Sequence, residues 1–246
     1  MYTSKNFRPI AITLAGFDPS GGAGVLADVK TFESLKVYGL AVNTSITIQN
    51  DQHFSNVLWQ KPTVIKSTLE ILAERYEVKA AKLGLHKDLK TVYENISALK
   101  KIWPSAKIVW DPILASSSGY DFKIDLNRKI LNKILSSVDL ITPNSIEFGK
   151  FGMTVDDYSC HLLLKGGHVK GKHSEDCLFV NGKLLQKYVS SRENKSEKHG
   201  SGCVLSSAIT AGLAKGYSLP RSVSKAKKYI DKFLSSTKTL SGFHKI

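Results

Sequence analysis

The amino-acid sequence predicts an α/β fold with a mainly parallel central sheet, in a single domain that spans residues 1–246. Short apolar segments typical of buried strands alternate with segments whose apolar residues recur at helical spacing. No repeat, low-complexity tract or linker divides the chain, and its length is sufficient for one well-buried core. Each element is justified below in chain order.

The first half of the chain begins with a strand at residues 9–15, where an apolar run follows a proline. The next segment, 24–36, has apolar residues at helical spacing. Further strands are expected at residues 40–49, 79–85, 107–110, 138–141 and 161–165, and further helices at residues 62–75, 88–101, 125–136 and 144–152. Strands separated by single helices in this way favour parallel pairing.

The last part of the chain changes pattern. Two short apolar segments, 177–180 and 183–189, are separated by Asn181 and Gly182. An Asn-Gly pair between strands is a strong signal for a tight hairpin, because both residues adopt positive φ angles easily. Helices are expected at residues 202–215 and 218–235.

The composition describes a globular protein with a formal net charge of +14. The basic residues are spread along the chain, and the densest cluster, residues 225–232, lies where helical spacing would expose most of its lysines to solvent. No RNA-recognition motif or zinc-finger pattern accompanies them, so we predict no nucleic-acid partner. Small anionic substrates that carry phosphate fit the charge equally well.

Cysteine usage and hydropathy suggest the compartment. The three cysteines, Cys160, Cys177 and Cys203, form no CxxC pair, which argues against a disulfide framework or a zinc site. No apolar run approaches the roughly 20 residues that a membrane span needs. The short apolar run near the N-terminus passes directly into a glycine-rich loop and is interpreted as a strand. A cytoplasmic protein without a membrane partner is expected.

Four strand–helix junctions carry residues suited to ligand binding, because loops at the carboxyl ends of parallel strands meet at one edge of the sheet. The first is AGFDPSGGAGVLAD, whose glycines allow a ligand to approach the backbone. It matches neither a Rossmann fingerprint nor a Walker A loop. An ordinary structural turn therefore stays an alternative at this position.

The second and third junctions carry carboxylates. In KIVWDPILASSSG, Asp111 ends an apolar strand and suits a hydrated Mg²⁺, although a turn or cap role is equally compatible. In DLITPNSIEF, Asn144 and Glu147 have the spacing of a helix capping box, which is a structural alternative to metal binding for Glu147.

The fourth junction is HGSGCVLSSA, and the strand LLLKGGH with Lys165 precedes it. A glycine turn that leads into a helix directs free backbone N–H groups toward one point and forms an anion site. A thiol there is expected to have a lowered pKa, which would make Cys203 reactive. A small packed cysteine at a helix start is the alternative, and His199 is expected to be a turn or capping residue.

Six segments in register, AITLAGFDPSGGAGVLADVKTFESLKVYGLAVNTSITIQND, AKLGL, VWDPIL, ITPNSIE, LLLKGGH and HGSGCVLSSAI, resemble the hydroxymethylpyrimidine/phosphomethylpyrimidine kinases of thiamine biosynthesis. The resemblance covers nearly the whole chain. It implies the three-layer α/β/α fold of the ribokinase-like superfamily, a homodimer, and ATP-dependent phosphorylation of 4-amino-5-hydroxymethyl-2-methylpyrimidine and then of its monophosphate.

The resemblance also implies a role for individual residues. It implies pyrimidine contacts for Gly16, Asp28, Gln49, Leu85 and Ile113, organisation of Mg²⁺ by Asp111 and Glu147, contacts to the ATP phosphates for Asn144 and Lys165, an anion hole at Gly200, Ser201 and Gly202, and Cys203 as the catalytic base. Sugar kinases and pyridoxal kinases of the superfamily typically have Asp at the last position, so the cysteine separates a pyrimidine kinase from them.

Some positions depart from the family pattern. Phe17 replaces a usual Ser or Thr and is expected to narrow the substrate entrance, and Leu85 replaces a frequent Met. Lys198 replaces a usual Thr and adds charge near the phosphates. The segment between Glu147 and Lys165 is short and has room for a single crossover helix. A pyridoxal-type kinase and a non-catalytic pyrimidine-binding paralogue remain alternatives.

Overall fold

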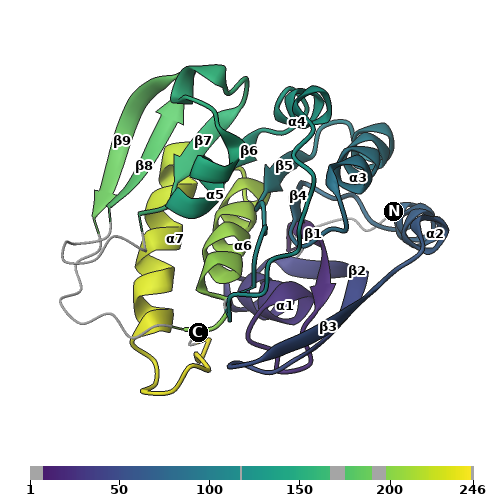
Figure 1. Cartoon of the computed structure of the whole chain (residues 1–246). Coiled ribbons are helices and arrows are strands. Elements are labelled where there is room, and N and C mark those ends of the chain that lie inside the picture. The colour runs from purple at the N-terminus through teal and green to yellow at the C-terminus, as the bar shows by residue number, and fades with distance from the viewer. Residues whose placement is uncertain (1–7, 117, 167–174, 190–197, 245–246) are drawn as a thin grey trace.

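One sheet organises the residues that the computed structural model describes, which are 8–116, 118–166, 175–189 and 198–244. Within them, nine strands are hydrogen-bonded in the order β3-β2-β1-β4-β5-β6-β7-β8-β9 (Figure 1). The strands are β1 Ile10–Phe17, β2 Tyr38–Gln49, β3 Phe54–Trp59, β4 Ala80–Leu83, β5 Lys107–Trp110, β6 Leu140–Ile141, β7 His161–Leu164, β8 Glu175–Val180 and β9 Lys183–Val189. The six strands from β2 to β7 in this order are parallel, and β3, β8 and β9 are antiparallel at the two ends.

Helices cover both faces of the sheet, which confirms the three-layer prediction (Figure 1). The helices are α1 Gly24–Ser34, α2 Pro62–Ala73, α3 Leu89–Ile102, α4 Arg128–Leu135, α5 Ser145–Phe151, α6 Ser201–Ala214 and α7 Leu219–Leu234. Helices α1, α6 and α7 pack together on one face, whereas α2, α3 and α4 pack on the other. The sheet is thereby buried on both sides, as a parallel sheet requires.

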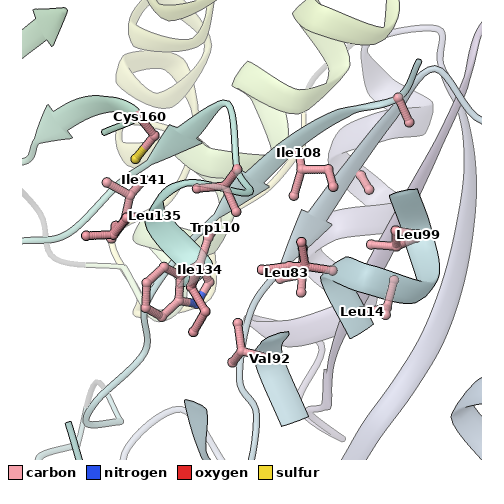
Figure 2. Close-up of a cluster of buried hydrophobic side chains, with 14 of the residues drawn as sticks. Leu14, Leu83, Val92, Leu99, Ile108, Trp110, Ile134, Leu135, Ile141 and Cys160 are labelled. Atoms are coloured by element: carbon pink, nitrogen blue, oxygen red, sulfur yellow. The ribbon is translucent and has the colours of Figure 1, made fainter. Parts of the chain in front are cut away.

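The core between the sheet and the α3–α4 layer consists mainly of aliphatic side chains, with a few aromatic rings such as Trp110 of β5, which is 2% exposed. Figure 2 shows how Leu83 and Ile108 of the sheet face Val92 and Leu99 of α3. Fully burying a side chain such as Leu, Ile or Val contributes about 1.5–3 kcal/mol to the free energy of unfolding, relative to leaving it in water. This packing fixes the parallel strands whose ends build the site.

The predicted elements agree with the structure to within a few residues, and the main omission is β3. Its sequence, FSNVLW, places the exposed polar residues Ser55 and Asn56 side by side, so no clean apolar alternation marks it as a strand. The predicted hairpin is confirmed, because Asn181 and Gly182 have φ angles of 51° and 73°. Strands β4 and β6 are shorter than predicted.

The short segment before Lys165 is also explained. It holds α5 and a 3₁₀ helix, Val155–Asp157, before the chain enters β7. A single short crossover helix is therefore enough to connect the parallel strands β6 and β7, as the sequence suggested. In the described part of the chain, no helix is both long and apolar enough to cross a membrane.

Candidate active site

A cavity of about 640 Å³ opens at the edge of the sheet where the parallel strands end. All of the residues predicted for the site line this cavity except Asp28: Gly16, Gln49, Leu85, Asp111, Ile113, Asn144, Glu147, Lys165, Gly200, Ser201, Gly202 and Cys203. They come from the ends of β1, β2, β4, β5, β6 and β7 and from the beginning of α6. The topology thus gathers residues that are distant in the sequence into one pocket.

Helix α6 begins against the glycine-rich loop that follows β1. Its N-cap, Gly200, has a φ of 71°, and a Cβ on this residue would lie 2.0 Å from the carbonyl oxygen of Gly22. Gly24 has a φ of 58°, and a Cβ on this residue would lie 2.0 Å from the carbonyl oxygen of Gly16. Only glycine fits at either position. The two loops therefore pack backbone to backbone, and the N-termini of α1 and α6 both reach the cavity.

Cys203 lies in the first turn of α6 and is 7% exposed. Burial raises the pKa of its thiol to about 11, against the opposing influence of Lys82 and of a backbone hydrogen bond from Gly24. The carboxylates of Asp28 and Asp111 raise the pKa further. The prediction of a lowered pKa is therefore wrong for this structure, because desolvation and two nearby carboxylates outweigh the groups that favour the thiolate.

Asp111 and Lys165 form an ion pair on the cavity wall, with Oδ1 and Nζ 2.9 Å apart. The hydroxyl groups of Thr142 and Ser206 also donate to the Asp111 carboxylate, at 3.0 Å each. Burial acts to raise the pKa of Asp111, but Lys165 and Lys82 outweigh it and the pKa is lowered. Asp111 is consequently ionised at neutral pH, and Lys165 is the partner that faces the cavity.

Asn144 and Glu147 form the capping box of α5. The Asn144 side chain accepts from the backbone N–H of Glu147, and the Glu147 carboxylate accepts from the backbone N–H of Asn144, each at 2.8 Å. The structural reading of this motif is thus confirmed, although both residues also line the cavity. Burial raises the pKa of Glu147 to about 6, opposed by Lys165 and reinforced by Asp111.

Asp28 was predicted to contact the substrate, but it does not line the cavity. Its side chain is fully buried beneath the cavity, where the Nζ of Lys82 lies 2.8 Å and 2.9 Å from its two oxygens. The hydroxyl groups of Thr13 and Ser207 donate to it as well, both at 2.6 Å. A carboxylate that receives all of these donors inside the protein has a structural partner already, so Asp28 joins β1, α1, β4 and α6 and leaves the substrate contact to other residues.

The other predicted acceptor contacts gather at one end of the cavity. Gln49 donates from Nε2 to the hydroxyl of Thr47, at 2.8 Å, and this leaves the amide oxygen of Gln49 to accept a hydrogen bond. Leu85 is buried beside Gly16, where a Cβ on Gly16 would lie 3.3 Å from the Leu85 side chain. These groups, with Ile113, form an apolar slot with one amide at its edge.

The departures from the family pattern have separate explanations. Phe17 is not among the cavity-lining residues, so it does not narrow the entrance as expected. The ammonium of Lys198 donates to the backbone carbonyls of Thr237 and Thr239. It therefore holds the segment after α7 against the beginning of α6, although it also contributes to the cavity wall.

His199 has a partner that the sequence did not suggest. Its Nε2 lies 2.8 Å from the carboxylate of Asp18, and both side chains are buried. Asp18 also accepts from the backbone N–H groups of Ser20 and Ala23. This pair connects the loop after β1 with the turn before α6, and it extends the expected turn role of His199 into a link between two loops.

Several residues of the site were missed from the sequence. They are Asp18, Thr47, Phe54, Phe122, Asp176 and Lys227 in the cavity wall, and Lys82 beneath it. Lys82 could have been noticed, since a lysine within the apolar strand AKLGL requires a buried anion. Lys227 pairs with Asp176 at 2.6 Å, a contact between α7 and β8 that no local pattern indicates.

The acidic side chains of the site do not form a ready-made metal cage. Among the described residues, no group of three or more His, Cys, Asp or Glu side chains is arranged to hold a metal ion. Asp111 and Glu147 are nevertheless close enough for Asp111 to raise the pKa of Glu147, and a cation would relieve that repulsion. The pair fits a cation that keeps most of its water, as Mg²⁺ commonly does.

Comparison with known proteins gives a consistent result. The family model described as phosphomethylpyrimidine kinase matches residues 18–245. A hydroxymethylpyrimidine/phosphomethylpyrimidine kinase from Aquifex aeolicus is 33% identical over 256 aligned positions, covering 96% of this chain and 98% of the relative. A crystal structure of phosphomethylpyrimidine kinase from Clostridium difficile is 31% identical with a TM-score of 0.73, covering 92% of this chain and 99% of the other.

A second solved structure is similar in shape. The ADP complex of Bacillus subtilis pyridoxal kinase is 25% identical, with a TM-score of 0.80 and coverage of 94% of this chain and 93% of the other. This comparison supports the ribokinase-like fold.

Proposed function

Because the chain belongs to the phosphomethylpyrimidine kinase family, we propose that it phosphorylates 4-amino-5-hydroxymethyl-2-methylpyrimidine and then its monophosphate, with ATP as the donor. Its relatives establish it as a phosphotransferase of thiamine biosynthesis. One observation carries the assignment of substrate. The amides that begin α6, the ammonium of Lys165 and the thiol of Cys203 share a cavity with the amide of Gln49 and the apolar slot.

At the acceptor end, Gln49 is suited to an aminopyrimidine. Its free amide oxygen can accept a hydrogen bond from the exocyclic amino group, while Leu85 and Ile113 pack against the ring. Gly16 lines the cavity, and a Cβ on this residue would lie 2.7 Å from the hydroxyl oxygen of Ser45, so glycine keeps this part of the wall closely packed. The hydroxymethyl group would then point toward Cys203.

At the donor end, the phosphates of ATP would bind between Lys165 and the beginning of α6. Gly200 and Gly202 offer backbone N–H groups at a helix N-terminus, where an anion is stabilised by hydrogen bonds and by the helix dipole. The N–H of Ser201 donates to the carbonyl of Lys198 at 3.3 Å instead. A Cβ on Gly202 would lie 3.4 Å from the Nζ of Lys165, so amides and ammonium act at one place. The bound ADP of the Bacillus subtilis pyridoxal kinase supports a nucleotide here.

Asp111 and Glu147 would hold Mg²⁺, directly or through water, and the Asp111 carboxylate also binds Lys165. When bound, the ion would supply positive charge to the phosphate oxygens. Burial and Asp111 raise the pKa of the Glu147 carboxyl group, and a bound cation would favour its ionised form. Asn144 fixes the carboxylate through the capping box.

Phosphoryl transfer would proceed in line. The hydroxymethyl oxygen attacks the γ-phosphorus, the bond to the bridging oxygen of ADP breaks, and the proton of the alcohol passes to the Cys203 thiolate. Lys165 and the amides of Gly200 and Gly202 would stabilise the charge that develops on the phosphoryl group. Since the pKa of Cys203 is about 11, the thiolate depends on Lys82 and on the Gly24 N–H to form.

Pyridoxal or pyridoxine is the second candidate acceptor. Both present a hydroxymethyl group on a flat heteroaromatic ring, and the fold matches a pyridoxal kinase with a TM-score of 0.80. Pyridoxal kinases of the superfamily typically have Asp at the position of Cys203, which favours the pyrimidine, but relatives with this cysteine motif include kinases with both activities. A comparison of the two acceptors with one enzyme preparation would distinguish them.

We also propose a homodimer formed through the outer face of β2 and β3. Side chains alternate along a strand, so Thr47 and Gln49 face the cavity while Ile46 and Ile48 point away from it. Ile46 lies opposite Leu58 in the antiparallel ladder. These three side chains are 48%, 51% and 55% exposed, and an apolar row of this kind is typical of an interface. Light scattering should report a dimer that Leu58→Glu dissociates.

The remaining expectations are proposals of the same kind. A metabolic kinase would work in a reducing cytoplasm, and the free cysteines Cys160, Cys177 and Cys203 accord with this. No nucleic acid or membrane would take part in the reaction. Turnover should therefore be indifferent to added RNA or lipid vesicles.

The decisive experiment measures ADP release with Mg²⁺ and ATP against hydroxymethylpyrimidine, its monophosphate, pyridoxal and ribose. We expect turnover with both pyrimidines, little with ribose, and a loss of at least about 100-fold in Cys203→Ala. The thermal melting temperature of the variant serves as the control for folding. Absence of turnover with either pyrimidine would overturn the proposed function, whereas near wild-type turnover in Cys203→Ala would remove this residue as the base.

A further inference from the structure

Three aromatic side chains form a cluster at the acceptor end of the cavity, and neither the sequence motifs nor the reaction accounts for them. The rings of Phe54 and Phe122 are 5.3 Å apart at an angle of 88°, and both residues line the cavity. The ring of Tyr120 lies 4.6 Å from that of Phe54 and 5.4 Å from that of Phe122. Each aromatic residue thus contacts the other two.

The cluster is assembled from two separate segments. Phe54 begins β3, whereas Tyr120 and Phe122 belong to the connection between β5 and α4. The connection is fastened by the backbone hydrogen bond from Phe122 to the carbonyl of Leu114, at 3.1 Å. Lys150 of α5 also donates to the carboxylate of Asp121, at 2.9 Å. Phe122 is therefore held from both sides, and its ring is pre-arranged at the cavity.

Two contacts locate the cluster next to the acceptor groups. Phe54 is the direct partner of Gln49 in the antiparallel pairing of β2 with β3. The hydrogen bond from Phe122 to Leu114 places Phe122 beside Ile113, the residue that precedes Leu114 in the chain. Gln49 and Ile113 are the groups proposed to bind the pyrimidine. The aromatic residues consequently lie next to groups that are proposed to bind the acceptor ring.

The geometry of the two cavity-lining rings suits a flat ligand. Phe54 and Phe122 stand edge to face, so together they form an apolar aromatic corner in the cavity wall. Phe54 is 6% exposed and Tyr120 is 41% exposed, which places Tyr120 on the outer side of the corner. A heteroaromatic ring gains stacking contacts in such a corner, whereas a sugar offers no aromatic face.

We propose that Phe54 and Phe122 form the wall against which the heteroaromatic ring of the acceptor packs, and that Tyr120 positions these two rings from outside. The proposal rests on the proposed function and adds to it the residues that select a flat acceptor. In this arrangement Gln49 forms a hydrogen bond with the polar edge of the ring, and the aromatic wall favours a flat ring over a puckered one.

The test compares two variants of the cluster with a control outside it. Phe122→Ala removes a wall residue, and Phe122→Leu keeps an apolar side chain but removes the aromatic face. Phe243→Ala removes an exposed phenylalanine that does not line the cavity, and it serves as the matched control. Steady-state kinetics would give KM and kcat for the pyrimidine alcohol and KM for ATP. Calorimetric titration of the pyrimidine alcohol would give its Kd without turnover, and melting temperatures would show that each variant is folded.

We expect Phe122→Ala to raise KM and Kd for the pyrimidine roughly 10-fold, and Phe122→Leu to raise them about 3-fold, because an aromatic pair contributes beyond buried area. KM for ATP should change less than about two-fold, as should every parameter of the control Phe243→Ala. An equal rise in KM for ATP, or an unchanged Kd for the pyrimidine in folded Phe122→Ala, would overturn the proposal.

The outcome is separable from that of the proposed function. Turnover by the wild-type chain tests the function, whereas the ratio between variant and wild type tests the wall. If the wild type phosphorylated pyridoxine alone, the same variants and titrations with pyridoxine would still decide whether Phe122 holds the acceptor ring. Unchanged pyridoxine binding in Phe122→Ala would then reject the wall.

Discussion

Two aspartate–lysine pairs lie close to each other in this protein and differ in what surrounds them. Asp28 and Lys82 are joined at 2.8 Å with both side chains fully buried. Asp111 and Lys165 are joined at 2.9 Å, but the Lys165 side chain is 13% exposed and both residues line the cavity. The second pair can exchange partners with a ligand, whereas the first is enclosed by protein groups.

The difference shows that residue chemistry alone does not define a catalytic group. A carboxylate whose donors all come from the protein, as in Asp28, holds elements of the fold together. A lysine beside a helix N-terminus in a cavity, as in Lys165, can transfer its hydrogen bonds to phosphate. Replacing members of each pair should therefore separate effects on stability from effects on turnover.

The largest expected effect is that of Lys82→Met. Removing the ammonium leaves the buried charge of Asp28 uncompensated, which should lower the free energy of unfolding by about 3–5 kcal/mol. Urea denaturation followed by circular dichroism measures this change. The double variant Lys82→Met/Asp28→Asn removes both charges and should recover part of the loss. A single variant as stable as the wild type would show that Asp28 is not held as an ion.

Lys165→Met should leave the fold in place and reduce turnover. We expect kcat to fall about 10²–10³-fold, since one positive group that stabilises the transferring phosphoryl group is lost. The melting temperature should fall much less than that of Lys82→Met. Lys107→Met is the matched control, because Lys107 forms an exposed pair with Asp139 and should change kcat less than two-fold. A small effect of Lys165→Met on kcat would remove this lysine from the mechanism.

The pH dependence of turnover tests Cys203, whose pKa is influenced by members of both pairs. Burial raises the pKa of Cys203 to about 11, so the thiolate is the minor form at neutral pH and its fraction grows with pH. If the thiolate is the base, kcat/KM should rise up to ~10-fold per pH unit between pH 7 and 9. The Cys203→Ala variant should lack this rise. A wild-type profile that is flat over this range would exclude the thiolate as the base.

The sequence predicted more of the phosphate end of the site than of the acceptor end. Gly200 and Lys165 lie in short motifs at strand–helix junctions, so local spacing and the parallel order of strands were enough to bring them together. Phe54 and Phe122 come from a strand that no alternation marked and from an irregular connection. Their proximity depends on tertiary packing, which local patterns do not encode.

The error at Asp28 and the error in the pKa expected for Cys203 have a common physical cause. The contact of Asp28 was implied by the family resemblance, and the lowered pKa of Cys203 was expected from its place at a helix start. Burial then decided their chemistry, since it gives Asp28 a permanent partner in Lys82 and raises the pKa of Cys203 to about 11. The degree of burial at a junction depends on the whole fold, and the sequence could not supply it.

The smallest effects come from two adjacent serines of α6, which offer the most closely matched comparison. Ser207 donates to Asp28 at 2.6 Å, and Ser206 donates to Asp111 at 3.0 Å. Ser207→Ala removes a buried hydrogen bond to a charged group and should cost about 1.5–3 kcal/mol in the free energy of unfolding, with kcat nearly unchanged.

Ser206→Ala should show the opposite division. The Ser206 hydroxyl also contacts the backbone carbonyls of Gly202 and Cys203. Its bond to Asp111 therefore contributes less to stability than the bond from Ser207 to Asp28. We expect a several-fold fall in kcat, because Asp111 loses one of the groups that orient it toward Lys165, and a loss of stability below about 1 kcal/mol. Denaturation curves and initial rates on both variants give the two quantities. If Ser207→Ala reduced kcat more than Ser206→Ala did, the enclosed pair would have a part in the reaction, and the distinction between the two pairs would fail.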